Sequence, residues 1–281
     1  MTLFEQLQVY FSYGFVRYAF IAGILISLCA GLLGVVLVLK RYAMIGDGLS
    51  HVAFGAMAVA AVLGFAPMTV ALPVTVAVAI LLLLAGEKRL IKGDSAIAML
   101  SAGSLAVGYL LLNLFPSSDT GSLSGDVCAS LFGSTSMMTL SGADVWLCVG
   151  LSAAVISFFV IFYHKIFAVT FDEGFATSSG VKVRFYNFLL AAVSGIVIVL
   201  AMKLVGALLI SSLIIFPALS AMRLFRSFRS VVICSAVISV LGSLTGLLAA
   251  LLLSPPTGAS VAVGHIVIFM AFTVVGKLRR A

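Results

Sequence analysis

Residues 15–39 read FVRYAFIAGILISLCAGLLGVVLVL, an apolar run of 25 residues whose one charged side chain, Arg17, lies near its start. A helix of about 20 apolar residues is long enough to cross the hydrocarbon core of a bilayer. The apolar core of a secretory signal peptide has only about 7 to 15 residues, and no small-residue cleavage site follows Leu39. We therefore expect this run to remain in the protein as a membrane span.

The rest of the chain repeats this pattern. Of the 281 residues, 63% are hydrophobic and 9% charged, and the mean hydropathy is +1.30, which excludes a water-soluble globular domain. The sequence predicts an all-α, polytopic transmembrane helical bundle that forms one domain over residues 1–281. Nine spans are expected, with eight as the alternative: 15–39, 44–65, 68–86, 95–114, 144–163, 185–202, 204–222, 230–253 and 260–276.

The charges between these runs predict an orientation. Lys and Arg gather in every second connecting segment, and segments 65–67, 115–143 and 254–259 contain none; the exceptions are Lys203, in a tight turn, and Arg17, near the start of the first span. Basic residues concentrate in cytoplasmic loops, so the pattern places the C-terminus in the cytoplasm, and nine spans place the N-terminus outside. The formal net charge of +7 is then explained by membrane orientation, and we expect no nucleic-acid partner.

Two connecting segments are long enough to contact other proteins. The external loop, about 115–143, is rich in Ser and Gly and suits an extracytoplasmic partner, although a partly re-entrant connector is an alternative. The cytoplasmic segment, about 164–184, contains Asp172 and Glu173, which favour the start of a short helix, and Gly180, which favours its end. Such a helix could sit in a groove of a cytoplasmic protein.

One apolar run combines a carboxylate with an imidazole. Asp47 and His51 are spaced i, i+4 and project from one face of a helix. Together they offer an oxygen and a nitrogen ligand to a divalent cation, a combination that suits zinc or manganese. A simple Asp–His hydrogen bond near a helix start is the alternative. A two-fold dimer facing its own axis would supply four ligands.

Other polar and small residues in the spans have simpler explanations. His265 stands alone among apolar residues, which favours packing or a hydrogen bond over contact with a substrate. Gly242 and Gly246 form a G-x-x-x-G pattern that permits close helix packing. The four cysteines are widely separated and contain no C-x-x-C pair, so we expect neither a disulfide framework nor a zinc site from them.

Several catalytic motifs are missing from the sequence. It has no G-x-x-x-x-G-K-[ST], so any ATP-driven step must come from another subunit. It also lacks H-E-x-x-H and G-x-S-x-G, and no second aspartate completes the dyad of an intramembrane aspartyl protease. We therefore expect that the chain is not itself an enzyme and binds no permanent cofactor.

Four segments resemble, in order, the permease subunits of ABC-type zinc and manganese uptake transporters. The first, LKRYAMIGDGLSHVAFG at residues 39–55, is similar to the signature that follows the first span in that family. The others are VTFDEGFATSSG at 169–180, KLVGALLISSLIIFPA at 203–218 and PPTGA at 255–259. The first two segments together make the resemblance specific.

The resemblance implies a multi-pass protein of the prokaryotic plasma (inner) membrane that works as a homodimer. Its implied partners are ABC ATPase subunits below and an extracytoplasmic metal-binding protein above. Asp47 and His51 match the family's metal-pathway residues, and Phe171, Asp172, Glu173 and Gly180 fall in the segment expected to contact the ATPase. We expect Zn²⁺ or Mn²⁺ as the transported substrate, with zinc slightly favoured. The alternatives are a stand-alone proton-coupled transporter of metal ions and, with less support, an intramembrane hydrolase.

Overall fold

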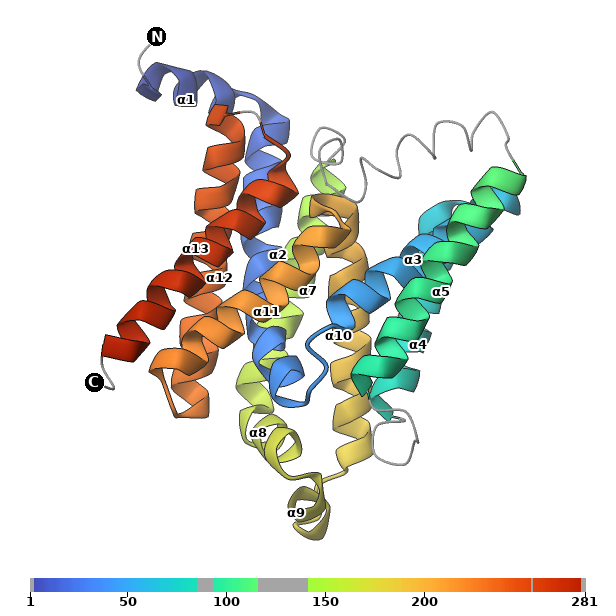
Figure 1. Ribbon diagram of the computed structural model, residues 1–281, viewed down its shortest axis with the longest axis vertical. Coiled ribbons are helices and arrows are strands. Elements are labelled where there is room, and N and C mark those ends of the chain that lie inside the picture. Colours follow the sequence, from blue (N-terminus) through green and yellow to red (C-terminus); the bar gives the residue numbers. More distant parts are fainter. Residues whose placement is uncertain (1–2, 85–92, 116–140, 254, 279–281) are drawn as a thin grey trace.

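The computed structural model describes residues 3–84, 93–115, 141–253 and 255–278, and these residues form only helices and short connections (Figure 1). The long helices of this part are α2 (Gly14–Leu39), α3 (Ile45–Val62), α4 (Pro67–Leu84), α5 (Gly93–Leu114), α7 (Gly142–Ile161), α10 (Val183–Val205), α11 (Ala207–Leu224), α12 (Phe228–Leu253) and α13 (Thr257–Leu278). The short ones are α1 (Leu3–Ser12), α8 (Tyr163–Phe171) and α9 (Glu173–Ser178).

The span count is close to the prediction. In the described part, eight helices are long and apolar enough to cross a membrane, which matches the alternative count of eight. Each of the nine predicted runs forms a helix, but the run at 204–222 becomes α11, whose apolar stretch Leu209–Leu224 is shorter than the others. The all-helical, polytopic architecture is confirmed. Most of the external loop, residues 116–140, lies outside the described residues.

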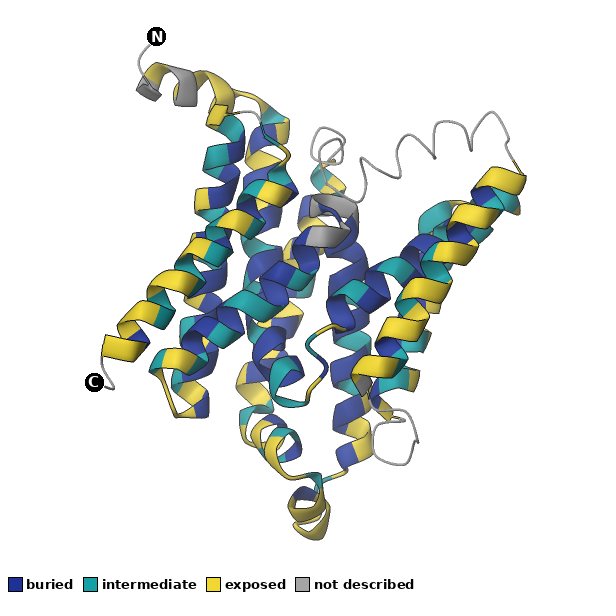
Figure 2. Ribbon diagram, viewed as in Figure 1, coloured by how far each residue is buried: buried dark blue, intermediate teal, exposed yellow. Residues whose placement is uncertain are grey.

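The first apolar run forms the central helix of the bundle. Helix α2 packs against α7, α10, α11 and α12, and its buried residues are among the dark positions in Figure 2. Two serines of α12 hydrogen-bond to backbone carbonyls of α2: Ser235 Oγ donates to Gly31 O at 2.8 Å, and Ser239 Oγ donates to Ser27 O at 2.6 Å. Small residues that let backbones approach, joined by hydroxyl hydrogen bonds, are typical of helix contacts in membranes.

Helices α3, α4 and α5 form a second group beside this core (Figure 1). Helix α3 packs against α5 and α4, and it also contacts α11. The seam between α3 and α5 is tight, because a Cβ on Gly55 would lie 2.8 Å from the carbonyl oxygen of Ser104, and one on Gly108 would lie 2.7 Å from the ring of Phe54. Glycine at these positions allows the two helices to lie in contact.

The contact between α12 and α13 confirms two sequence interpretations. A Cβ on Gly246 would collide with the backbone of Val261, and one on Gly242 would collide with the ring of His265, so the G-x-x-x-G pattern does serve close helix packing. His265 is fully buried there, and its Nδ1 lies 2.8 Å from the carbonyl oxygen of Val261 in its own helix. It is a packing residue between α12 and α13.

The basic segments gather at one end of the bundle. The α2–α3 turn, helices α8 and α9, the α11–α12 turn and the end of α13 all lie toward the lower end in Figure 1. The α3–α4 and α12–α13 turns, which contain no Lys or Arg, lie toward the upper end. The arrangement of helices thus agrees with the alternation of loop charges in the sequence.

Candidate functional site

Asp47 and His51 face each other on α3, one turn apart. His51 Nε2 lies 3.4 Å from Asp47 Oδ1, and the exposed fractions of the two side chains are 16% and 30% respectively. The second ring nitrogen of His51, Nδ1, is buried and has no hydrogen-bond partner among the described residues. Neighbouring ligands on a divalent transition metal lie about 3.0 to 3.6 Å apart when the bonds are about 2.1 to 2.2 Å long and the angle between them is octahedral or tetrahedral. The pair therefore has the spacing of two adjacent metal ligands.

The local sequence explains why this pair stands at a helix start. Lys40 ends α2, and Arg41 takes a positive φ of 63°, which reverses the chain before α3 begins at Ile45. Asp47 then falls in the first turn of α3, where the positive end of the helix dipole favours a carboxylate. The i, i+4 spacing places His51 one helical turn after Asp47 on the same face of α3, as the sequence predicts.

A third polar group on this site was not predicted. The hydroxyl of Ser101, on α5, donates a long hydrogen bond of 3.4 Å to Asp47 Oδ2, so Asp47 is contacted through both carboxylate oxygens. Ser101 is 54 residues away along the chain, and only the contact between α3 and α5 brings it near. The one feature of the sequence that could have pointed to Ser101 is that it carries a hydroxyl within an apolar run.

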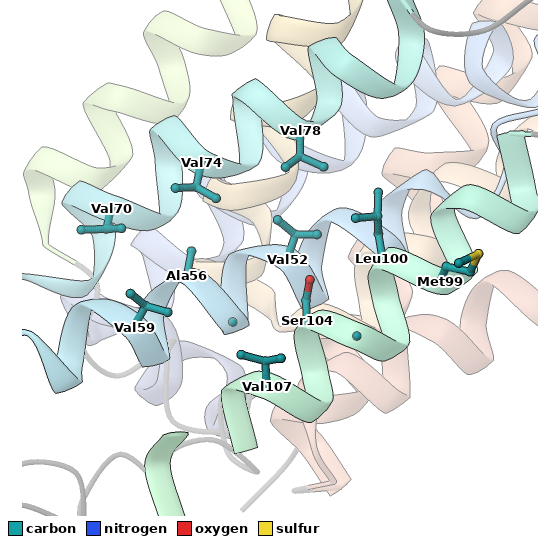
Figure 3. Close-up of a pocket in the computed structure, with 12 residues that line it drawn as sticks. Val52, Ala56, Val59, Val70, Val74, Val78, Met99, Leu100, Ser104 and Val107 are labelled. Carbon is teal, nitrogen blue, oxygen red and sulfur yellow. The ribbon is translucent and has the colours of Figure 1, made fainter. Parts of the chain in front are cut away.

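An apolar pocket of about 430 Å³ begins at Val52 on α3, next to His51 in the chain, and its wall on α5 runs from Met99 to Val107 (Figure 3). Its walls come from α3, α4 and α5, and Ser104 is the one labelled side chain in Figure 3 that carries a polar atom. It offers a cation neither carboxylate nor imidazole. In the described part, no three His, Cys, Asp or Glu side chains gather at one place, so Asp47 and His51 remain the candidate metal ligands.

A second polar cluster joins the cytoplasmic segment to the bundle. Lys40 Nζ pairs with Glu173 Oε1 at 2.5 Å and donates to Asn187 Oδ1 at 2.8 Å. Asn187 Nδ2 donates to the same Glu173 oxygen at 3.0 Å. The Lys40 side chain is only 7% exposed. We call these three residues the Lys40–Glu173 joint; it ties the start of α9 to the end of α2 and to α10.

Helix α9 has the ends that the sequence predicts. Asp172 caps it, because its Oδ1 accepts a 2.8 Å hydrogen bond from the backbone N–H of Phe175. Gly180 follows the helix with a φ of 80°, a conformation that glycine adopts at little cost. Phe171 and Phe175 are 58% and 67% exposed. The four residues predicted to contact the ATPase thus differ in environment: Phe171 is exposed, Asp172 and Gly180 shape the helix, and Glu173, whose side chain is 30% exposed, pairs with Lys40.

The other candidate residues take no part in the site. His265 lies in α13, which packs against α11 and α12. Cys29 and Cys148 are buried, and Cys29 Sγ contacts Ser152 Oγ at 3.2 Å in the packing of α2 against α7. Cys128 lies outside the described residues.

Comparison with known proteins decides the family. Residues 12–276 match the profile described as "ABC 3 transport family". The chain belongs to the ABC 3 transport family. It is therefore a multi-pass membrane protein of a bacterial ABC transporter, the permease subunit of an importer for a divalent metal, and not the ATPase.

Two relatives and two solved structures support the assignment. The chain is 27% identical to the "Manganese import system permease protein ScaB" of Streptococcus gordonii, over 98% of this chain and 96% of that protein. It is 26% identical to the "Manganese transport system membrane protein MntC" of Listeria innocua, over 92% and 90%. The structure titled "PsaBC from Streptococcus pneumoniae in complex with Fab" matches with a TM-score of 0.81 and 26% identity, over 96% and 95%. A structure described as a putative metal-chelate type ABC transporter in an inward-facing conformation shares the fold, with a TM-score of 0.72 and 20% identity over 91% and 84%.

Proposed function

We propose that two copies of this permease form the pathway of an ATP-driven manganese importer, and that Asp47 and His51 of each copy contact the ion in transit. The observation that carries the proposal is the pair itself: a carboxylate oxygen and an imidazole nitrogen 3.4 Å apart, both partly exposed, at a helix start. A single chain supplies two ligands. A two-fold pair of chains supplies four, and the remaining positions on the metal can be filled by water.

Manganese rather than zinc is the proposed cargo. The preference for zinc drawn from the sequence finds no support among the relatives, since both relatives named above are called manganese proteins. The ligand types agree with either metal, because carboxylates suit manganese and imidazole suits many divalent metals. The pair contains no thiolate, which would favour zinc or copper(I).

We further propose nine crossings, with α11 as the seventh. In Figure 1, α10 runs from the lower to the upper end, α11 runs back to the lower end, and α12 rises again. With the basic end in the cytoplasm, this path puts the C-terminus inside and the N-terminus outside. The C-terminal end of α2 and helix α9 then face the ATPase subunits, and the loop at 115–143 faces the external binding protein.

The Lys40–Glu173 joint suggests how ATPase movement reaches the metal pair. In this proposal Phe171 and Phe175 contact the ATPase, while Asp172 and Gly180 fix the shape of α9. Glu173 passes any displacement of α9 to Lys40 at the end of α2. Lys40 is separated from Asp47 by six residues, the turn that sets the start of α3, so a shift of this turn would move Asp47 relative to α5.

The test is uptake of manganese-54 and zinc-65 by cells that express the permease with its ATPase and binding protein. We compare wild type with Asp47→Ala and His51→Ala at matched membrane levels, and use Asp94→Asn as the control because Asp94 is an exposed carboxylate of α5. We expect manganese uptake in wild type and the control, and uptake near background in the two variants. Normal uptake in both variants would refute the role of the pair.

The same assay separates energy sources. An ATPase subunit inactivated in its own nucleotide site should abolish uptake if the proposal holds. A stand-alone proton-coupled transporter would instead continue to transport without a functional ATPase and stop when the proton gradient is collapsed. Family membership favours the first result.

A further inference from the structure

A second cavity lies between α7, α8, α12 and α2, and no residue of α3 or α5 lines it. It has a volume of about 450 Å³, within the range of small-molecule sites. Phe159 and Val232, both buried, line it deeply. Ile156, Val160 and Ile233 line it as exposed side chains, and Val160 is 73% exposed. The groove is thus apolar along its length and open on the outer surface of two membrane-spanning helices.

The polar groups of this groove lie where the spans end. His164 follows the end of α7 at Ile161, and Arg229 is in the first turn of α12. Both side chains are exposed, and in the described part of the chain neither makes a hydrogen bond or an ion pair. The start of α12 adds the positive end of a helix dipole on the same side. The groove therefore joins an apolar channel to a cationic end.

The nearby carboxylates do not neutralise this end. No Asp or Glu lines the groove. The two acidic residues that follow α8 are engaged elsewhere: Asp172 caps α9 and Glu173 pairs with Lys40. Lys165, the next basic residue after His164, points to the ring of Tyr186 at 5.6 Å. Arg229 and His164 are left to bind an external anion.

We propose that this groove binds one anionic phospholipid. One acyl chain lies along Ile156, Val160 and Ile233, and the phosphate contacts Arg229 and His164. Basic pockets between membrane helices are typical binding places for anionic headgroups, and a guanidinium can bind a phosphate through two parallel hydrogen bonds. A soluble anion would gain nothing from the apolar walls, and a protein helix would leave the cationic end unpaired. The proposal depends on membrane insertion alone and not on the cargo.

The site also has a structural consequence. The groove touches α8 and α12, and α8 leads directly into α9. A lipid phosphate bound there would hold α8 against α12 beside the segment proposed to contact the ATPase. Lipid composition would then change the coupling of ATP hydrolysis to transport without any change at Asp47 or His51.

The test is native mass spectrometry of the purified full chain, released from detergent after titration with phosphatidylglycerol or with phosphatidylcholine of the same acyl chains. We expect the first lipid retained under activation to be phosphatidylglycerol, bound about tenfold more tightly than phosphatidylcholine. Arg229→Gln should lower phosphatidylglycerol binding about tenfold and remove the preference, because it deletes the charged hydrogen bonds. Equal binding of the two lipids by wild type would overturn the proposal.

Two further variants and one competitor sharpen the test. Arg226→Gln is the matched control, because Arg226 is an exposed arginine in the short connection before α12 but does not line the groove; an equal loss in this variant would show only general charge attraction and refute the site. Val160→Trp changes a lipid-facing side chain outside the core, fills the groove and should reduce binding of both lipids. Glycerol 3-phosphate should not displace the bound lipid; if it does, the site binds free phosphate and the proposal fails.

Discussion

The metal pair and the Lys40–Glu173 joint lie on either side of one turn, between α2 and α3, but they are bonded differently. In the joint, Lys40 is bound to two partners, Glu173 accepts from two donors, and the Lys40 side chain is only 7% exposed. In the pair, the Asp47–His51 and Asp47–Ser101 contacts are both 3.4 Å long, and His51 Nδ1 has no partner in the described part of the chain. A saturated cluster holds the fold together, whereas an unsaturated cluster retains the capacity to bind a ligand.

This difference has an energetic meaning. Removing one partner from a buried ion pair leaves an uncompensated charge, which costs about 3 to 5 kcal/mol. Removing a loosely bonded, partly hydrated side chain costs much less. The two clusters should therefore respond in opposite ways to substitution: stability should depend on the joint, and transport on the pair.

The largest change in stability is expected for Glu173→Ala. It leaves the ammonium group of Lys40 buried with Asn187 as its single remaining partner, so we expect the free energy of unfolding to fall by about 3 kcal/mol. Thermal unfolding of the purified protein in detergent measures this. The double variant Lys40→Met with Glu173→Leu removes both charges and should recover most of the loss. If Glu173→Ala melts like wild type, the joint does not stabilise the fold.

Substitution of the neighbouring carboxylate, Asp172, should lower the free energy of unfolding by a smaller amount. Asp172→Ala removes the cap of α9 but no buried charge, and loss of an N-cap side chain costs about 1 kcal/mol. Asp172→Asn, which can still accept the hydrogen bond from Phe175 N–H, should stay within about 0.5 kcal/mol of wild type. A loss as large as that of Glu173→Ala would mean that α9 is held by its cap rather than by the joint.

At the metal pair we expect little loss of stability. Asp47→Ala should change the free energy of unfolding by less than about 1 kcal/mol, because its two contacts are long and the side chain is 30% exposed. The same protein should transport manganese at background level. Thermal unfolding and uptake, measured on one preparation of membranes, test both statements. Strong destabilisation by Asp47→Ala would place this pair in the same structural class as the joint.

The sequence predicted the parts of this arrangement that depend on local order. Apolar run lengths give the helices, the i, i+4 spacing gives the Asp47–His51 pair, and Asp172 with Gly180 gives the ends of α9. It did not predict that Glu173 pairs with Lys40, because the two residues are 133 positions apart and no periodicity relates them. It also favoured zinc, because oxygen and nitrogen ligands alone do not distinguish zinc from manganese.

The smallest effect is expected for Ser101, which links α5 to the metal pair by one long hydrogen bond. Ser101→Ala should leave thermal stability unchanged. If the hydroxyl orients Asp47 for the ion, losing it removes about 0.5 to 1 kcal/mol of favourable interaction, which corresponds to a fall in manganese uptake of about two- to fivefold. Ser104→Ala, one turn along α5 in the apolar pocket, is the matched control and should transport normally. An equal fall in both variants would mean that the packing of α5 against α3, and not the contact with Asp47, sets the rate.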